Sequence, residues 1–192
     1  MTIFLILAPF AAFALLMLVT SAAASLFAGA AVAAAIIGYE VWRGRSIKML
    51  AAGAVIMFSA LGCYISLIDG DWSATEVRLA VDVGTLGLAL ASIAIRAPFT
   101  LQYAREAVDA ETARMPGFIR ANYIVTSAWT GAFMLMALAN ALMIYRPGLP
   151  LWSALLVAFA ARNSAVYFTR WYPRYRRAKY GAISAPALPV TG

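Results

Sequence analysis

Apolar stretches of about twenty residues alternate with short polar segments along most of the chain. Since a bilayer core requires about 20 apolar residues per helical span, each stretch is long enough to cross a membrane. A spanning segment must satisfy its own backbone hydrogen bonds, so each is expected to be helical. The pattern predicts an all-α, polytopic integral membrane protein with about six transmembrane helices, at residues 3–19, 22–42, 49–68, 77–95, 123–145 and 151–168.

The polar segment between the fourth and fifth stretches has a pattern of its own. Proline residues bound it, apolar residues recur in it every seven positions, and polar residues cluster on another face. The residues concerned are Pro98 and Pro116, then Leu101, Val108 and Met115, then Gln102, Arg105, Glu106 and Asp109. This spacing predicts an amphipathic connector helix at the cytoplasmic membrane surface, with a weak Arg105–Asp109 pair. A solvated connector with no partner is the alternative interpretation.

The two ends of the chain differ from the middle. Residues 1–170 are expected to form the six-span domain, and residues 171–192 a basic, aromatic cytoplasmic tail that is partly disordered. At the other end, small residues from Ser21 to Ala24 resemble a signal-peptidase site, which leaves open whether the first span is retained. The positively charged n-region of a signal peptide is missing, which favours retention.

Lysine and arginine collect in every second gap between the apolar stretches. All but Arg78, Arg146 and Arg162 fall in three clusters, at residues 43–48, 96–120 and 170–179. With six spans these clusters lie on one side together with both termini. Because cytoplasmic loops are enriched in lysine and arginine, that side is predicted to be cytoplasmic.

The amino-acid composition agrees with a membrane location and limits which ligands and cofactors are expected. The chain is 64% hydrophobic and 12% charged, and its mean hydropathy is +0.83. The net charge of +7 is explained by anionic lipid of the cytoplasmic leaflet, so nucleic acid is not an expected partner. The chain has no histidine and one cysteine, Cys63. No metal ligand set and no cofactor are expected.

Two ionisable residues interrupt apolar stretches. Asp82 lies roughly 7 Å from the outer end of the fourth span, and Arg162 lies about 16 Å into the sixth. Such residues are costly inside a bilayer and commonly mark ion or substrate pathways. We predict a candidate intramembrane polar site that comprises Asp82, Arg162, Asn163 and Asn140. The competing interpretation is structural, with Asp82 and Arg162 paired or each reaching toward its nearer surface.

No arrangement of a nucleophile, paired carboxylates or a glycine-rich phosphate loop is visible, so the chain is not expected to be an enzyme. A second set of residues is expected to contact the membrane surface or a partner protein: Arg105, Glu106, Arg170, Arg174, Arg176 and Arg177.

Three short segments resemble the bacterial intracellular septation protein A family. They are the aromatic, basic stretch Tyr39–Lys48, the connector entry Arg96-Ala97-Pro98-Phe99, and the fifth span, where Trp129 precedes Ala139-Asn140. The resemblance implies a bacterial inner-membrane protein with a role in septation or the cell envelope. It also implies membrane-protein partners or a homo-oligomer, and no enzymatic activity.

Two functions are therefore compatible with the sequence. The first is a non-enzymatic envelope or cell-division protein that acts through partners in the membrane. The alternative is a small transporter or channel that uses Asp82 and Arg162.

Overall fold

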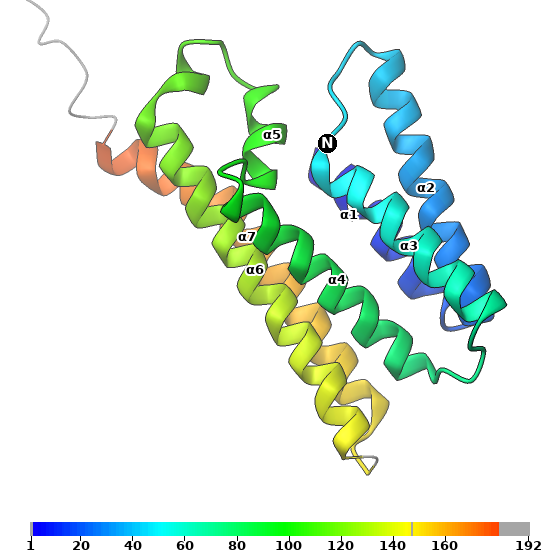
Figure 1. The fold of residues 1–192 in the computed structure, drawn as a ribbon. Helices are drawn as coiled ribbons and strands as arrows, with labels where there is room; N and C mark the ends of the chain where they lie inside the picture. The colour runs from blue at the N-terminus through cyan, green and yellow to red at the C-terminus, as the bar shows by residue number, and fades with distance from the viewer. Residues whose placement is uncertain (1, 147, 181–192) are drawn as a thin grey trace, which may run out of the picture.

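The computed structural model describes residues 2–146 and 148–180, and this part of the chain is helical with short connections. Figure 1 shows long helices that run back and forth between two ends of the molecule. The elements are α1 (Thr2–Leu16), α2 (Ala22–Trp42), α3 (Met49–Leu67), α4 (Ala74–Ala94), α5 (Phe99–Arg105), a 3-10 turn η1 (Thr112–Arg114), α6 (Pro116–Tyr145) and α7 (Leu151–Tyr180).

The prediction of an all-α, polytopic membrane fold is confirmed. Within the described residues, five helices are long and apolar enough to cross a membrane: α2, α3, α4, α6 and α7. The remaining predicted span, the first one at residues 3–19, corresponds to α1, whose 15 residues reach about 22 Å. It ends at Leu16 because the next residues form turns, in which the Leu16 carbonyl accepts from the backbone N–H groups of Val19 and Thr20. Ser21 then caps α2.

The long helices pack as two lobes. In the N-terminal lobe, α2 packs on α1 and α3, and in the C-terminal lobe, α6 packs on α4 and α7. Each lobe has its own apolar core, centred on Phe58 in the first and on Trp129 and Phe133 in the second. Trp129 also donates to Thr169 at 2.9 Å, which joins α6 to α7. The lobes meet mainly along α3 and α4, where a Cβ added at Gly53 would lie 2.5 Å from Leu88.

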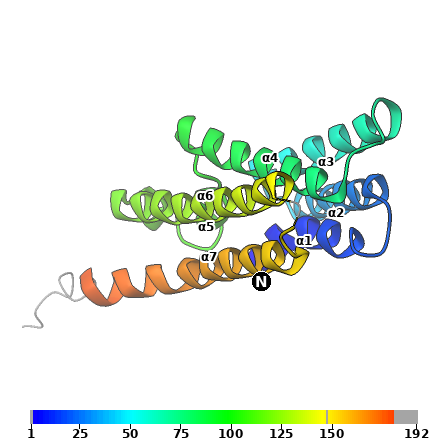
Figure 2. The ribbon, with the colours of Figure 1, turned by 90° about the horizontal axis from the view of Figure 1, so that it is seen from below.

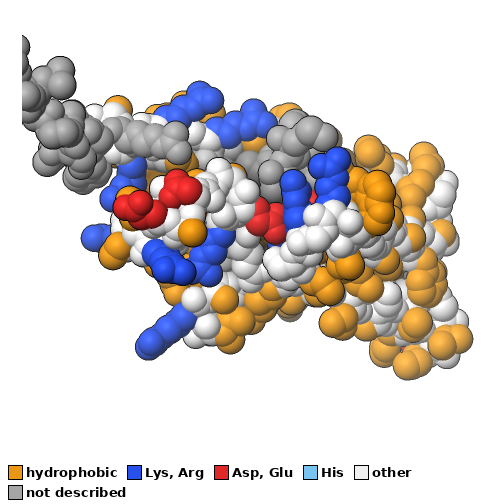
Figure 3. Space-filling model, turned by 90° about the horizontal axis from the view of Figure 1, so that it is seen from above, with side chains coloured by type: hydrophobic (Ala, Val, Ile, Leu, Met, Phe, Trp, Pro, Cys, Tyr) orange, Lys and Arg blue, Asp and Glu red, His pale blue; other side chains and the backbone are white. Residues whose placement is uncertain are grey.

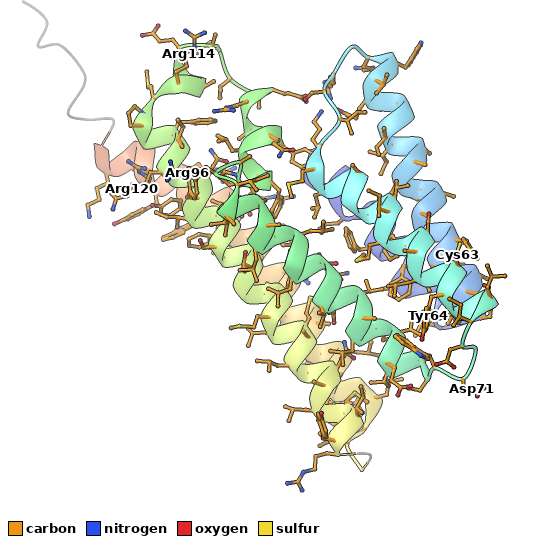
Figure 4. The ribbon with its side chains drawn as sticks, viewed as in Figure 1. Cys63, Tyr64, Asp71, Arg96, Arg114 and Arg120 are labelled. Atoms are coloured by element: carbon orange, nitrogen blue, oxygen red, sulfur yellow. The ribbon has the colours of Figure 1, made fainter. Side chains whose placement is uncertain are left out.

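The charged residues divide between the two ends of the molecule as the sequence predicts. Arg96, Arg114 and Arg120 lie at one end, and Asp71 lies at the other (Figure 4). We call the first the basic end; Lys and Arg side chains gather over it in Figure 3. The alternation of the helices places the 43–48 loop, α5 and the C-terminal part of α7 at this end as well.

The connector is not one amphipathic helix. α5 ends at Arg105, and a second helical segment appears only at η1. Asp109 accepts from both the backbone N–H and the hydroxyl of Thr112, at 2.8 and 2.9 Å, and these bonds hold the pKa of its carboxyl below the usual value. Such local side-chain bonds compete with a continuous helix. The predicted Arg105–Asp109 pair is not among the ion pairs of the described residues, and Asp109 bonds to Thr112 instead.

The predicted boundary between the last span and the tail also differs from the structure. α7 continues without interruption to Tyr180, through Pro173, which has no N–H to donate to the Thr169 carbonyl. Aromatic stacking accompanies the extension, with the Phe168–Tyr172 and Trp171–Tyr175 ring pairs inclined by 17°. The segment from Ala182 to Gly192, expected to be disordered, lies outside the described residues.

Two helices end at the basic end in the same backbone motif but with different residues. α2 ends in a Schellman motif with Gly44 in the left-handed region at φ 70°, and α4 ends in one with Arg96 at φ 59°. Glycine adopts this conformation without a Cβ clash, whereas other residues are strained there by roughly 1 kcal/mol.

Arg96→Gly is therefore expected to stabilise the protein by about 1 kcal/mol, and Gly44→Ala to destabilise it by a similar amount. Thermal unfolding in detergent measures both, with expected shifts of about 2–4 °C in opposite directions. A lower Tm for Arg96→Gly would instead show that the Arg96 side chain contributes more than the strain costs.

Candidate functional site

The residues of the predicted intramembrane site lie on three helices of the C-terminal lobe. Asp82 on α4 is 7% exposed, and its Oδ2 accepts a hydrogen bond of 2.7 Å from Nδ2 of Asn140 on α6. Asn140 is equally buried. A buried carboxylate requires such donors, because water cannot solvate it there. The structure thus brings these two residues of the predicted site into contact.

Arg162 on α7 approaches Asp82 without forming a salt bridge with it. The Asp82 carboxylate and the Arg162 guanidinium interact electrostatically, but the ion pairs found in the described residues do not include them. The Nε atom of Arg162 is buried and has no hydrogen-bond partner. A closed Asp82–Arg162 pair, one of the two forms of the structural interpretation, is therefore absent from the described part of the chain.

A second arginine acts on the same carboxylate. Arg78 lies one helical turn before Asp82 on α4, on the side of the acidic loop at residues 69–73, and interacts with it electrostatically. At 1.5 Å of rise per residue, Asn140, Asp82 and Arg162 lie roughly 8, 12 and 16 Å from that end of their helices. Arg78, Asp82, Asn140 and Arg162 thus form a polar cluster between the end with the acidic loop and the middle of the membrane; we call it the membrane cluster.

Asn163, the fourth residue of the predicted site, does not lie with the membrane cluster. Its side chain is exposed and donates to the Phe159 carbonyl of its own helix at 2.8 Å. Successive residues of a helix point about 100° apart, so Asn163 cannot share the direction of Arg162.

A second, charged cluster lies at the basic end. Lys48 is 2% exposed, and its Nζ contacts Glu40 at 2.7 Å and Glu106 at 2.6 Å. Arg45 contacts the same two carboxylates at 3.3 and 3.9 Å. This ionic network joins the end of α2 and the α2–α3 loop to the segment after α5. It connects the N-terminal lobe to the connector by charge as well as by packing.

Two neighbouring side chains of α5 complete the ionic network. The Tyr103 ring faces Lys48 at 5.9 Å from the ring centroid, and burial, together with the Glu40 and Glu106 carboxylates, raises the pKa of the Tyr103 phenol well above its usual value. The Gln102 side-chain oxygen accepts from the Met49 N–H at 2.8 Å, at the start of α3. Glu40, Lys48 and Tyr103 also line one side of a mainly apolar cleft whose remaining walls come from α1, α2, α3 and the α2–α3 loop.

The residues predicted to contact the membrane surface occupy different environments. Arg105, Arg170 and Arg174 are exposed at the basic end. Glu106 is exposed as well, but its carboxylate is held by Lys48 in the ionic network. Arg176 donates to the Gly117 carbonyl at 2.7 Å and so joins the extension of α7 to the start of α6. The side chain of Arg177 lies outside the described residues.

Sequence reasoning missed Arg78 and the ionic network. The spacing of Arg78 and Asp82, four residues apart on one helix, was a usable signal for a shared face. The ionic network had no such signal, since Glu106 is remote from Glu40 and Lys48 in the sequence. It comes close to them only because the segment after α5 lies beside the α2–α3 loop. Within the described residues, no group of three or more His, Cys, Asp or Glu side chains could hold a metal ion.

Searches against protein-family models, curated proteins and solved structures found no match to this chain. The resemblance to the septation protein A family, and the role in division or the envelope that it implies, therefore remain predictions from sequence.

Proposed function

We propose that this multi-pass membrane protein is a small transporter or channel, and that its solute passes the membrane cluster. The observation that supports the proposal is the buried Arg162 Nε–H without an acceptor, close to a carboxylate that is itself bonded to Asn140. A purely structural arginine would be expected to use its donors on Asp82, because an unpaired buried donor costs about 1–3 kcal/mol.

The positions of the polar groups support the same function. Arg78, Asp82 and Arg162 follow one another from the end with the acidic loop toward the membrane middle, which suits stepwise passage of a charged species. Intramembrane ionisable residues commonly serve ion pathways or proton relays. The two-lobe arrangement, with three helices in each lobe, offers a division across which one lobe can move relative to the other.

Asp82→Asn tests the proposal. The substitution keeps the side-chain shape and a hydrogen-bond acceptor for Asn140 but removes the charge. We expect it to lower flux at least ten-fold while the protein still folds. The measurement uses the purified full chain in liposomes that contain potassium chloride and either a pH-sensitive or a chloride-sensitive dye, with valinomycin setting the membrane potential.

Asp71→Asn is the matched control, since it removes the same charge from the exposed loop before α4 (Figure 4). It should leave flux unchanged. The proposal would be overturned if wild-type liposomes conducted no faster than empty ones, or if Asp82→Asn and Asp71→Asn behaved alike. In that event, capture of division or envelope-synthesis proteins by cross-linking would become the leading test of function.

A further inference from the structure

The charges of the membrane cluster do not balance. Two guanidinium groups, Arg78 and Arg162, face one carboxylate, Asp82. Within the described residues, Asp82 is also the one acid close enough to act on either arginine. One positive charge therefore lacks a compensating negative charge inside the apolar part of the protein, where an unpaired charge is expensive.

The hydrogen bonds of the cluster identify which positive charge this is. Asp82 receives its short hydrogen bond from Asn140, and Arg78, on the same helix one turn away, lies nearer to the surface. Arg162 lies deeper, and its Nε–H has no acceptor. The missing partner is therefore a hydrogen-bond acceptor with one negative charge, located beside the Arg162 guanidinium.

We propose that the membrane cluster binds a small monovalent anion, held by the Arg162 guanidinium and drawn toward it by Arg78. This inference rests on the proposed transport function and names its solute class. A guanidinium offers several N–H donors in one plane and keeps its charge at all accessible pH values, so it suits an anion better than a neutral solute. A divalent anion would leave an excess negative charge beside Asp82, so monovalent anions are expected to be preferred.

The size of the anion follows from the polar groups that the membrane cluster contains. Apart from the two arginines these are Asp82, which is negative, and Asn140, whose amide already donates to Asp82. The cluster therefore has few polar groups with which to bind a large polyhydroxylated anion. Chloride or nitrate should therefore bind, and gluconate should not.

Anion binding is measured without transport, by thermal unfolding of the full chain in detergent. Sodium chloride, nitrate, sulfate and gluconate are compared at equal ionic strength. Because a ligand that binds only the folded state stabilises it, saturating chloride or nitrate should raise Tm by about 3 °C relative to gluconate. The part of the rise that depends on Arg162 should be smaller in sulfate than in either monovalent anion, because sulfate also stabilises folded proteins through its exclusion from their surface.

Arg162→Gln should abolish this rise, and Arg174→Gln, an exposed arginine of the same helix, should leave it intact. If Arg162→Gln fails to fold, Arg78→Gln replaces it and should weaken chloride binding several-fold. Equal Tm values of the wild type in chloride and gluconate would overturn the inference, as would an undiminished rise in the folded arginine variant.

The outcome is distinguishable from failure of the proposed function. Liposome flux that depends on Asp82 but persists with gluconate as the sole anion would retain a transporter and overturn the anion as its solute. Absence of any flux, combined with an Arg162-dependent Tm rise in chloride, would retain the anion site and overturn transport.

Discussion

Lys48→Met is expected to destabilise the protein by about 3–5 kcal/mol, the largest effect among the substitutions considered. The substitution keeps the length of the side chain but removes the charge that contacts Glu40 and Glu106 at 2.7 and 2.6 Å. Both carboxylates would keep only Arg45, which lies farther from them and is 43% exposed. Thermal unfolding in detergent, followed by circular dichroism, measures the loss.

Arg43→Met is the matched control. It removes a positive charge near the same loop from an exposed residue whose guanidinium lies over the Tyr39 ring. Its expected cost is about 1 kcal/mol or less. The triple variant Lys48→Met, Glu40→Gln, Glu106→Gln should recover most of the lost stability, because replacing a buried ionic group as a whole is far less costly than removing one partner. If Lys48→Met were no worse than Arg43→Met, the ionic network would not contribute to stability.

Asn140→Leu is expected to cost about 2–3 kcal/mol, the second largest effect on stability. The substitution removes the 2.7 Å hydrogen bond to Asp82 and leaves a buried carboxylate without its donor. Hydrogen bonds to charged groups contribute about 1.5–3 kcal/mol. The same unfolding measurement applies.

Asn163→Leu is the control for chemistry and size, because Asn163 is exposed and bonds only to its own helix. It should change stability by less than about 0.5 kcal/mol. Asn140→Ser, which keeps a hydrogen-bond donor for Asp82 on a smaller side chain, should lose less stability than Asn140→Leu. An Asn140→Ser variant as unstable as Asn140→Leu would show that packing, not the hydrogen bond, explains the effect.

The ionic network also bears on how the two lobes remain together. Close helix contact between them is concentrated on α3 and α4, while Lys48 and Glu106 join the α2–α3 loop to the segment after α5. If the lobes opened at the basic end, either the Lys48–Glu106 ion pair would break or the connector would move together with the N-terminal lobe. The ionic network therefore helps to hold the lobes together at the basic end, whereas the membrane cluster lies nearer to the other end.

The sequence alone determined the fold class, because the length and spacing of apolar segments are set by the thickness of a bilayer. Helix boundaries of α2 and α3 follow the prediction within a residue. Prediction failed where local bonds or long-range contacts changed the backbone. Asp109 accepts hydrogen bonds from Thr112 where a continuous connector helix was predicted, and the Arg176–Gly117 hydrogen bond accompanies an α7 that is longer than its apolar run.

The candidate site divides in the same way. Asp82 and Arg162 could be identified from sequence, because ionisable residues in apolar stretches are rare whatever the fold. The contacts of these residues depended on how the helices rotate and pack. Only the structure shows that Asn140 bonds to Asp82 and that Asn163 does not join them. It also shows that Lys48 lies between Glu40 and Glu106. The apolar pattern of the sequence places a residue along its helix and so gives its depth in the membrane. The direction of its side chain depends on how the helix packs against its neighbours, and that packing exists only in the tertiary structure.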